Sequence, residues 1–141
     1  MSKNSELEDF FKQEQIHNYL VLTPNAKQFE ELLQPETGFI ILTRIKEIIA
    51  LFFKQNTVLN LCFDMRNIQR IDSSTLTFLL IAERLQKNRI DESPNVSIIV
   101  NYSEDEHSPH AILTNEGLTR VFSLHHTHDE FVEHISTNKT N

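Results

Sequence analysis

The stretch from Thr57 to Lys87, TVLNLCFDMRNIQRIDSSTLTFLLIAERLQK, decides the fold. It opens with Thr57–Phe63, a nearly continuous apolar run that is typical of a parallel strand covered on both faces. A loop follows through Asp64 to Arg70. Asp72-Ser73-Ser74 then offers side chains that accept hydrogen bonds from the free N–H groups of a first helical turn, so a helix is predicted over Leu76–Lys87.

Strand-like and helix-like segments alternate on both sides of this unit. Three more short apolar runs are read as strands: Tyr19–Leu22, Val96–Val100 and Val121–Leu124. Three more segments are read as helices: Ile41–Phe52, Ser108-Pro109 to Glu116 with Gly117 as its C′ residue, and His128 (or Thr127) to Ile135. Phe29–Leu33 fits either state. The alternation predicts an α/β fold with a mixed, mainly parallel β-sheet and helices packed on it.

The chain length of 141 residues corresponds to one domain. Its first part, 1–16, is charged, and Leu7, Phe10, Phe11 and Glu14 have helical spacing, so we expect an N-terminal arm or short helix. The domain proper is predicted over 17–135, and 136–141 is predicted to be a polar tail.

Composition narrows the classes of partner. The formal net charge is −7 and no basic cluster occurs, which argues against nucleic acid and against an anionic membrane as partners. No apolar run reaches the roughly 18 residues of a membrane span, and Met1–Glu6 lacks the apolar core of a secretory signal. Cys62 is the only cysteine, which excludes an internal disulfide. We therefore expect a cytoplasmic protein that binds another protein.

Metal binding and catalysis have little support in the sequence. His125-His126-Thr127-His128 is dense in histidine, but adjacent histidines at a strand end point in different directions, whereas zinc needs three or four converging ligands. Neighbouring Asp72 and Ser73 do not have the geometry of a catalytic triad, in which the carboxylate orients the base. Cys62, in mid-strand, is expected to pack in the core. We expect no enzymatic activity, metal or cofactor.

The predicted helix 76–87 carries apolar side chains on two sides. At about 100° per residue, one group falls nearly opposite the other: Phe78, Ile81, Ala82 and Leu85 against Leu76, Leu79 and Leu80. Either both groups are buried, one on the sheet and one under a neighbouring helix, or part of the Leu76/Leu79/Leu80 group is an apolar binding surface beside Ser73.

Several of these segments together resemble the STAS domain family. The resemblance rests on Val58–Leu61, Ile71–Ser74 followed by Leu76, and the later Gly117-Leu118 before Val121-Phe122. It covers roughly Leu59 to Ile135, including the closing Asp129-Glu130-Phe131. The resemblance is to the STAS domains that act as anti-sigma factor antagonists.

The resemblance implies a phosphorylation-controlled partner switch. By position, Ser73 matches the family's phosphoacceptor, and the implied partner is an anti-sigma factor and serine kinase of the histidine-kinase-like ATPase type. The implied partner-binding residues are Asn67, Gln69, Asp72, Ser73, Ser74, Thr75, Leu76, Leu79 and Leu80. A weak homodimer is a further alternative.

Thr75 departs from the family, which usually has glycine at this position. A β-branched side chain there is expected to crowd a kinase, which favours an alternative: an unphosphorylated STAS scaffold or subunit of a transport or signalling complex. A third alternative, of a different class, is a small metal- or ligand-binding domain or enzyme that uses the His-rich C-terminal end.

Overall fold

The structure is a computed structural model that describes residues 10–25, 38–55, 59–71, 73–89, 94–115 and 117–139. It contains five strands: β1 (Phe11–Ile16), β2 (Tyr19–Pro24), β3 (Asn60–Asp64), β4 (Ser97–Ile99) and β5 (Ser123–His125). Its helices are α3 (Gly38–Gln55), α4 (Ser73–Arg89), α5 (Pro109–Asn115), the short 3-10 helix η1 (Leu118–Arg120) and α6 (His128–Lys139). None of these helices is both long and apolar enough to cross a membrane.

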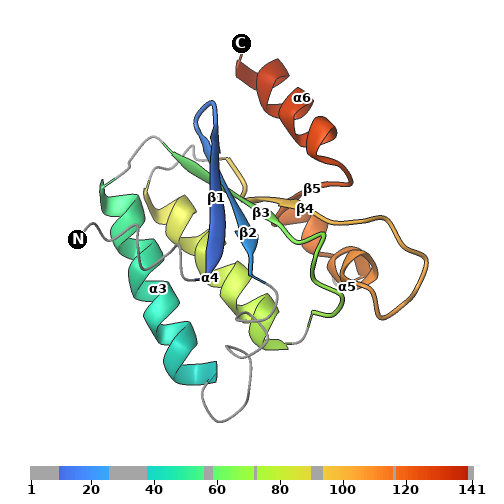
Figure 1. Cartoon of the computed structure of the whole chain (residues 1–141), viewed down its shortest axis with the longest axis horizontal. Coiled ribbons are helices and arrows are strands. Elements are labelled where there is room, and N and C mark those ends of the chain that lie inside the picture. The colour runs from blue at the N-terminus through green and yellow to red at the C-terminus, as the bar shows by residue number, and fades with distance from the viewer. Residues whose placement is uncertain are drawn as a thin grey trace.

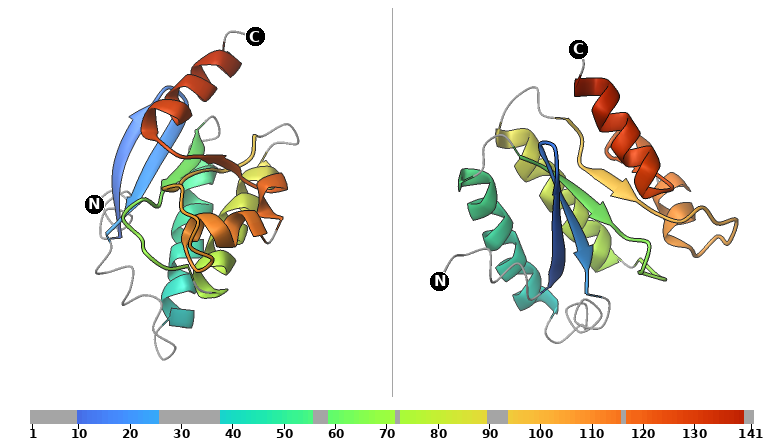
Figure 2. Two further views of the ribbon diagram at one scale, coloured as in Figure 1. Left: turned by 90° about the vertical axis from the view of Figure 1, so that its right-hand side faces the viewer. Right: turned by 45° about the horizontal axis from the view of Figure 1, so that its top comes forward.

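The strands form one sheet in the order β1-β2-β3-β4-β5. The pair β1 and β2 is antiparallel, and β2 through β5 are parallel to one another. The predicted α/β class with a mixed, mainly parallel sheet is confirmed. Right-handed crossovers between sequential parallel strands place every connecting helix on the same face. Accordingly α3, α4 and α5 share one face, and α6 lies on the other (Figures 1 and 2).

The two sheet faces carry separate apolar clusters. The larger lies under α3, α4 and α5 and includes Leu20, Leu22 and Phe63. The smaller lies under α6 and consists of six buried residues: Tyr19, Val21, Cys62, Ile99, Phe131 and Ile135. Successive side chains of a strand point to opposite faces, which explains why neighbours in β2 belong to different clusters. Cys62 is buried in the core, as predicted.

The prediction of an arm or short helix over residues 1–16 is wrong for Phe11–Ile16, which form an edge strand. The helical spacing misled because the Phe11 side chain is buried by the sheet's larger cluster, where its ring lies 5.9 Å from that of Phe78. A two-residue turn at His17 and Asn18 joins β1 to β2, and His17 takes the positive φ of 53° that such hairpin turns need. Residues 1–9 lie outside the described residues.

Other boundaries shift for similar reasons. The predicted polar tail is wrong for residues 136–139, because α6 continues to Lys139 after the buried Ile135. The last strand begins at Ser123 rather than Val121, because η1 occupies the residues after Gly117. The predicted start of α5 is confirmed: the Ser108 hydroxyl accepts a hydrogen bond from the Ala111 N–H at 3.1 Å. Gly117 has φ 70°, as expected of a residue that ends a helix. Phe29–Leu33 lies outside the described residues.

Helix α4 is buried on two sides, one against the sheet and one against α3. Phe78, Leu79 and Ala82 are all buried, and so are two polar residues, Glu83 and Gln86. The Glu83 carboxylate accepts a hydrogen bond from the Val96 N–H at 3.2 Å. The Gln86 side chain accepts one from Leu61 N–H at 2.8 Å and donates one to the Pro94 carbonyl at 2.7 Å. These bonds attach α4 to the beginning of β3 and to the segment that leads into β4.

Candidate functional site

The candidate site lies at the edge of the sheet where the parallel strands end. Two loops meet there: residues 65–71, which lead from β3 toward α4, and residues 100–108 between β4 and α5. Strands that run in parallel deliver the loops after them to one edge of the sheet, so segments 35 residues apart in sequence touch: the Asn101 side chain donates a hydrogen bond to the Arg66 carbonyl at 3.2 Å.

The β3–α4 loop is held in place by its own polar side chains. The Arg66 guanidinium donates two hydrogen bonds to the Asp64 carboxylate, at 2.9 and 2.8 Å. This bonding raises the pKa of Arg66 further above its ordinary value, so the guanidinium stays charged. The Asn67 side chain donates a 2.7 Å hydrogen bond to the Pro24 carbonyl at the end of β2. Asp64 is therefore committed to an ion pair, and the loop is tied to the strands on both sides.

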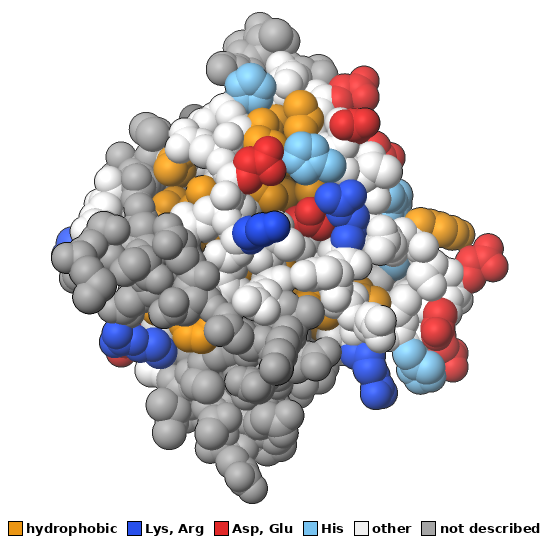
Figure 3. Space-filling view, viewed as in Figure 1, with side chains coloured by type: hydrophobic (Ala, Val, Ile, Leu, Met, Phe, Trp, Pro, Cys, Tyr) orange, Lys and Arg blue, Asp and Glu red, His pale blue; other side chains and the backbone are white. Residues whose placement is uncertain are grey.

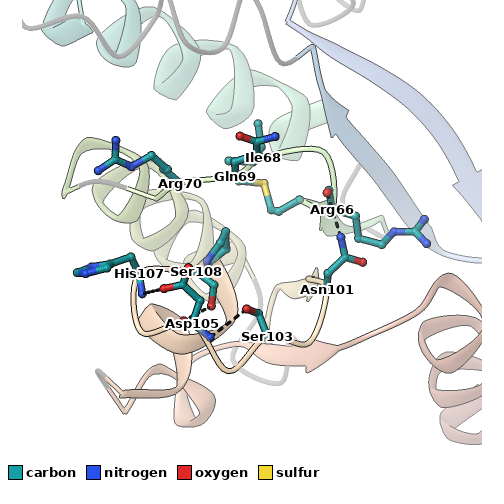
Figure 4. Close-up of a pocket in the computed structure, with 11 residues that line it drawn as sticks. Arg66, Ile68, Gln69, Arg70, Asn101, Ser103, Asp105, His107 and Ser108 are labelled. Carbon is teal, nitrogen blue, oxygen red and sulfur yellow. Dashed lines mark hydrogen bonds between the residues drawn. The ribbon is translucent and has the colours of Figure 1, made fainter.

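A pocket of about 640 Å³ lies between the two loops (Figure 4). Its size falls in the range of small-ligand and side-chain sites. It is lined by Met65, Arg66, Ile68, Gln69, Arg70, Asn101, Ser103, Asp105, His107, Ser108 and Pro109. Asp105 lies on the β4–α5 side of the pocket in Figure 4, where its carboxylate accepts a hydrogen bond from the His107 N–H at 2.9 Å. Arg70 and His107 extend outward on the same side of the pocket.

The two walls of this pocket differ in charge. The β3–α4 loop contributes Arg66 and Arg70, both exposed. The β4–α5 loop contributes Asp105, which belongs to the exposed acidic run from Glu104 to Glu106, and acidic side chains gather over this loop in Figure 3. Arg66 is paired with Asp64, whereas Arg70 forms no ion pair with a described residue. The edge therefore presents one available cation beside an acidic loop.

The predicted site residues differ in where the structure places them. Asn67 and Gln69 are exposed on the β3–α4 loop, and Leu80 is 41% exposed on the outer face of α4. Leu76 is half-buried against the larger apolar cluster. Ser73 is the first residue of α4, as predicted, and Ser74 follows it. Asp72 lies outside the described residues.

The prediction of a partner-binding side chain is wrong at two positions. Thr75 and Leu79 have no solvent exposure, so neither side chain is available to a partner. Both lie on the inward side of α4, together with Ala82 and Gln86, at the spacing of one helix face. The expectation that Thr75 crowds an approaching kinase is also wrong, because its side chain is enclosed by the fold.

Sequence reasoning missed the second wall of the pocket. Ser103, Asp105 and His107 line the pocket but are not among the predicted site residues. Their position follows a strand of a parallel sheet, just as the loop before Ser73 does. Because both loops follow strands of one parallel sheet, the sequence could have indicated that they lie side by side.

The histidines lie apart from this pocket, with the exception of His107. His110 and His126 pack against Tyr102, with ring centroids 4.8 and 5.9 Å from its ring. Each also places its Nδ1 near a backbone carbonyl, that of Ser103 for His110 and that of Val100 for His126. Within the described ranges, no three His, Cys, Asp or Glu side chains converge as metal ligands would.

Fold and site together define an α/β protein with a polar pocket at the carboxyl edge of a mainly parallel sheet. No protein-family model and no curated protein matches the sequence. Among solved structures, the chain is similar to the protein TM1081, whose structure was determined by NMR. The two share 14% sequence identity with a TM-score of 0.57, over 87% of this chain and 86% of TM1081. At this identity the likeness concerns the fold alone.

Proposed function

We propose that this chain is a STAS-type anti-sigma factor antagonist in the cytoplasm, a regulatory protein-binding domain that is not an enzyme. The observation that carries the proposal is the place of Ser73. It is the first residue of a helix of 17 residues, and the loop that leads to this helix at the carboxyl edge of the sheet carries the exposed residues Asn67, Gln69 and Arg70. Loops held on a rigid scaffold are common sites of recognition.

The position of Ser73 suits a phosphorylation switch. The first turn of a helix has free N–H groups and the positive end of the helix dipole, both of which stabilise an added phosphate. A phosphoserine adds about −1.5 to −2 charge units at neutral pH. That charge would change the electrostatics of the carboxyl edge, to which the start of α4 belongs. The proposed partner is a serine kinase and anti-sigma factor of the histidine-kinase-like ATPase type, which the unphosphorylated form binds.

Two features of the surrounding surface support partner binding. The pocket between the two loops offers Arg70 and Gln69 next to the first turn of α4. One turn further along α4, Leu80 is exposed and offers an apolar contact. The burial of Thr75 supports phosphorylation as well, because it leaves the approach to Ser73 without the β-branched side chain expected there.

The test compares three variants with the wild type for labelling by ATP and for complex formation with the kinase. Ser73→Ala should abolish labelling. Ser73→Asp should weaken the complex by tenfold or more, because it puts a permanent charge in the interface. Thr119→Asp is the charge-matched control, because Thr119 is exposed in η1 at the opposite edge of the sheet. This variant should bind the kinase as tightly as the wild type does.

Two outcomes would contradict parts of the proposal. A wild type that is never labelled, with Ser73→Asp binding normally, would replace the switch by an unphosphorylated STAS scaffold. Loss of binding in Thr119→Asp as large as in Ser73→Asp would show that net charge, rather than the edge at Ser73, governs the complex.

A further inference from the structure

A buried histidine that the proposed function does not use lies beside the smaller cluster under α6. His125, the last residue of β5, points to the face that α6 covers and is only 8% exposed. Its ring lies 5.6 Å from the ring of Phe131 and 5.0 Å from that of His134, both on α6. An imidazole is thus enclosed between the sheet and a single helix.

The polar end of this ring has no partner. The Nε2 atom of His125 is buried, and no described residue forms a hydrogen bond with it. A neutral imidazole tolerates this position at a moderate cost, because only one nitrogen goes unpaired. An imidazolium does not, since a buried charge needs a partner or water. The docked position of α6 therefore requires His125 to be neutral.

We propose that α6 is an acid-released cover of this sheet face, and that protonation of His125 is what releases it. When α6 leaves, His125 gains water on the side that Phe131 and His134 now occupy. The proton thus binds the open form more tightly than the docked form, and by linkage it favours opening.

The charges around His125 set the direction of the effect. Burial is the main reason why the pKa of His125 is lowered from 6.5 to about 4 in the docked form, and the neighbouring His134 and His126 add to the lowering. Glu130 on α6 acts the other way. From the remaining elements around the cluster, β4 contributes no titratable side chain, and burial raises the pKa of the Tyr19 phenol on β2 and of the Cys62 thiol on β3, so both stay neutral. Docking is therefore fully stable above about pH 6.5 and weakens as the pH falls toward 4.

The contact between His128 and Glu14 opposes the release of α6. His128 at the start of α6 lies 3.8 Å from the Glu14 carboxylate on β1, and its protonation strengthens that contact. The two side chains are 34% and 62% exposed, so solvent screens the pair and its contribution is small. At the other end of α6, the Ser136 hydroxyl lies 3.4 Å from Nε2 of the exposed His17. The buried His125 therefore outweighs these contacts, and the net effect of lower pH is to favour release of α6.

Cys62 provides a direct readout of the cover. It is the only cysteine in the chain, and it lies fully buried in the cluster under α6. Its reaction rate with a dithiodipyridine reagent, divided by the rate of the urea-unfolded chain at the same pH, measures how often the face opens. If His125 alone titrates between 4 and 6.5, this ratio should rise about twenty-fold from about pH 7 to about pH 5. The Glu14–His128 pair should reduce that figure somewhat.

The variants His125→Leu and His125→Gln remove the titrating group, one with an apolar and one with a polar side chain. Both should make the ratio independent of pH to within about twofold. His107→Gln, in the exposed β4–α5 loop, is the matched control and should keep the wild-type profile.

Urea unfolding at each pH separates local opening from global unfolding. Opening of the α6 cover should remain at least about tenfold more frequent than global unfolding at every pH, since local opening costs less than the whole fold. The proposal is overturned by a flat wild-type profile, by an unchanged profile in both His125 variants, or by labelling that coincides with global unfolding.

Discussion

The two faces of the sheet are covered by clusters of different size and chemistry. The face under α3, α4 and α5 is closed by a large apolar cluster that includes the stacked and tilted rings of Phe11, Phe63 and Phe78. The face under α6 is closed by six buried residues and is bordered by histidines. The first face carries the stability of the fold, whereas the second is the one whose closure responds to protons.

The largest effect should come from the larger cluster. Phe63 is fully buried against Phe11 and Phe78, so Phe63→Ala removes its ring contacts and leaves a cavity. We expect a loss of about 3–5 kcal/mol in the free energy of unfolding, measured by urea titration. Leu80→Ala, on the exposed side of α4, is the control and should change stability by less than about 0.5 kcal/mol. A loss for Phe63→Ala as small as that of the control would contradict this account of the two faces.

A matched truncation under α6 should act locally. Ile135→Ala removes a buried side chain from the last turns of α6. We expect a loss of about 2 kcal/mol, because α6 can settle toward the smaller side chain at its own end. Most of that loss should appear as faster labelling of Cys62, with a smaller change in global unfolding. Equal changes in labelling and in global unfolding would mean that the two faces open together.

The polar attachment of α4 should rank next. Gln86→Met keeps the approximate volume of the side chain but leaves the Leu61 N–H and the Pro94 carbonyl without their partner. A loss of about 1–3 kcal/mol is expected, because buried backbone groups would go unpaired. Asn88→Ala is the control variant, at an exposed position of α4 two residues after Gln86. Unchanged stability of Gln86→Met would show that water replaces the amide.

The smallest effect is expected at the rim of α6. Glu14→Gln removes the carboxylate that faces His128 and should cost less than about 1 kcal/mol at pH 6, since both side chains are partly exposed. The cost should shrink at about 1 M salt, which screens exposed charges. A cost that is the same at low and at high salt would mean that the contact is not ionic.

The sequence predicted the elements better than it predicted their faces. The order of strands and helices from Tyr19 onward, the cap at Ser108 and the turn residue Gly117 all follow from local rules of spacing and capping. Phe11–Ile16 was misread because the residues that bury Phe11 are far away in sequence. Thr75 and Leu79 were misassigned to a binding surface for the same reason, since helix spacing cannot say which neighbours enclose a stripe.

By itself, the sequence determined the class of fold, the start of α4 at Ser73 and the acidic balance that favours a protein partner. These depend on hydrogen bonds, periodicity and charge within short segments. The tertiary structure alone decided that the loops before α4 and α5 enclose one pocket, that Gln86 bonds to two separate segments, and that His125 is buried under α6. Two of these contacts join segments tens of residues apart, Asn101 with Arg66 and Gln86 with Leu61, and the register of the parallel strands brings those segments together.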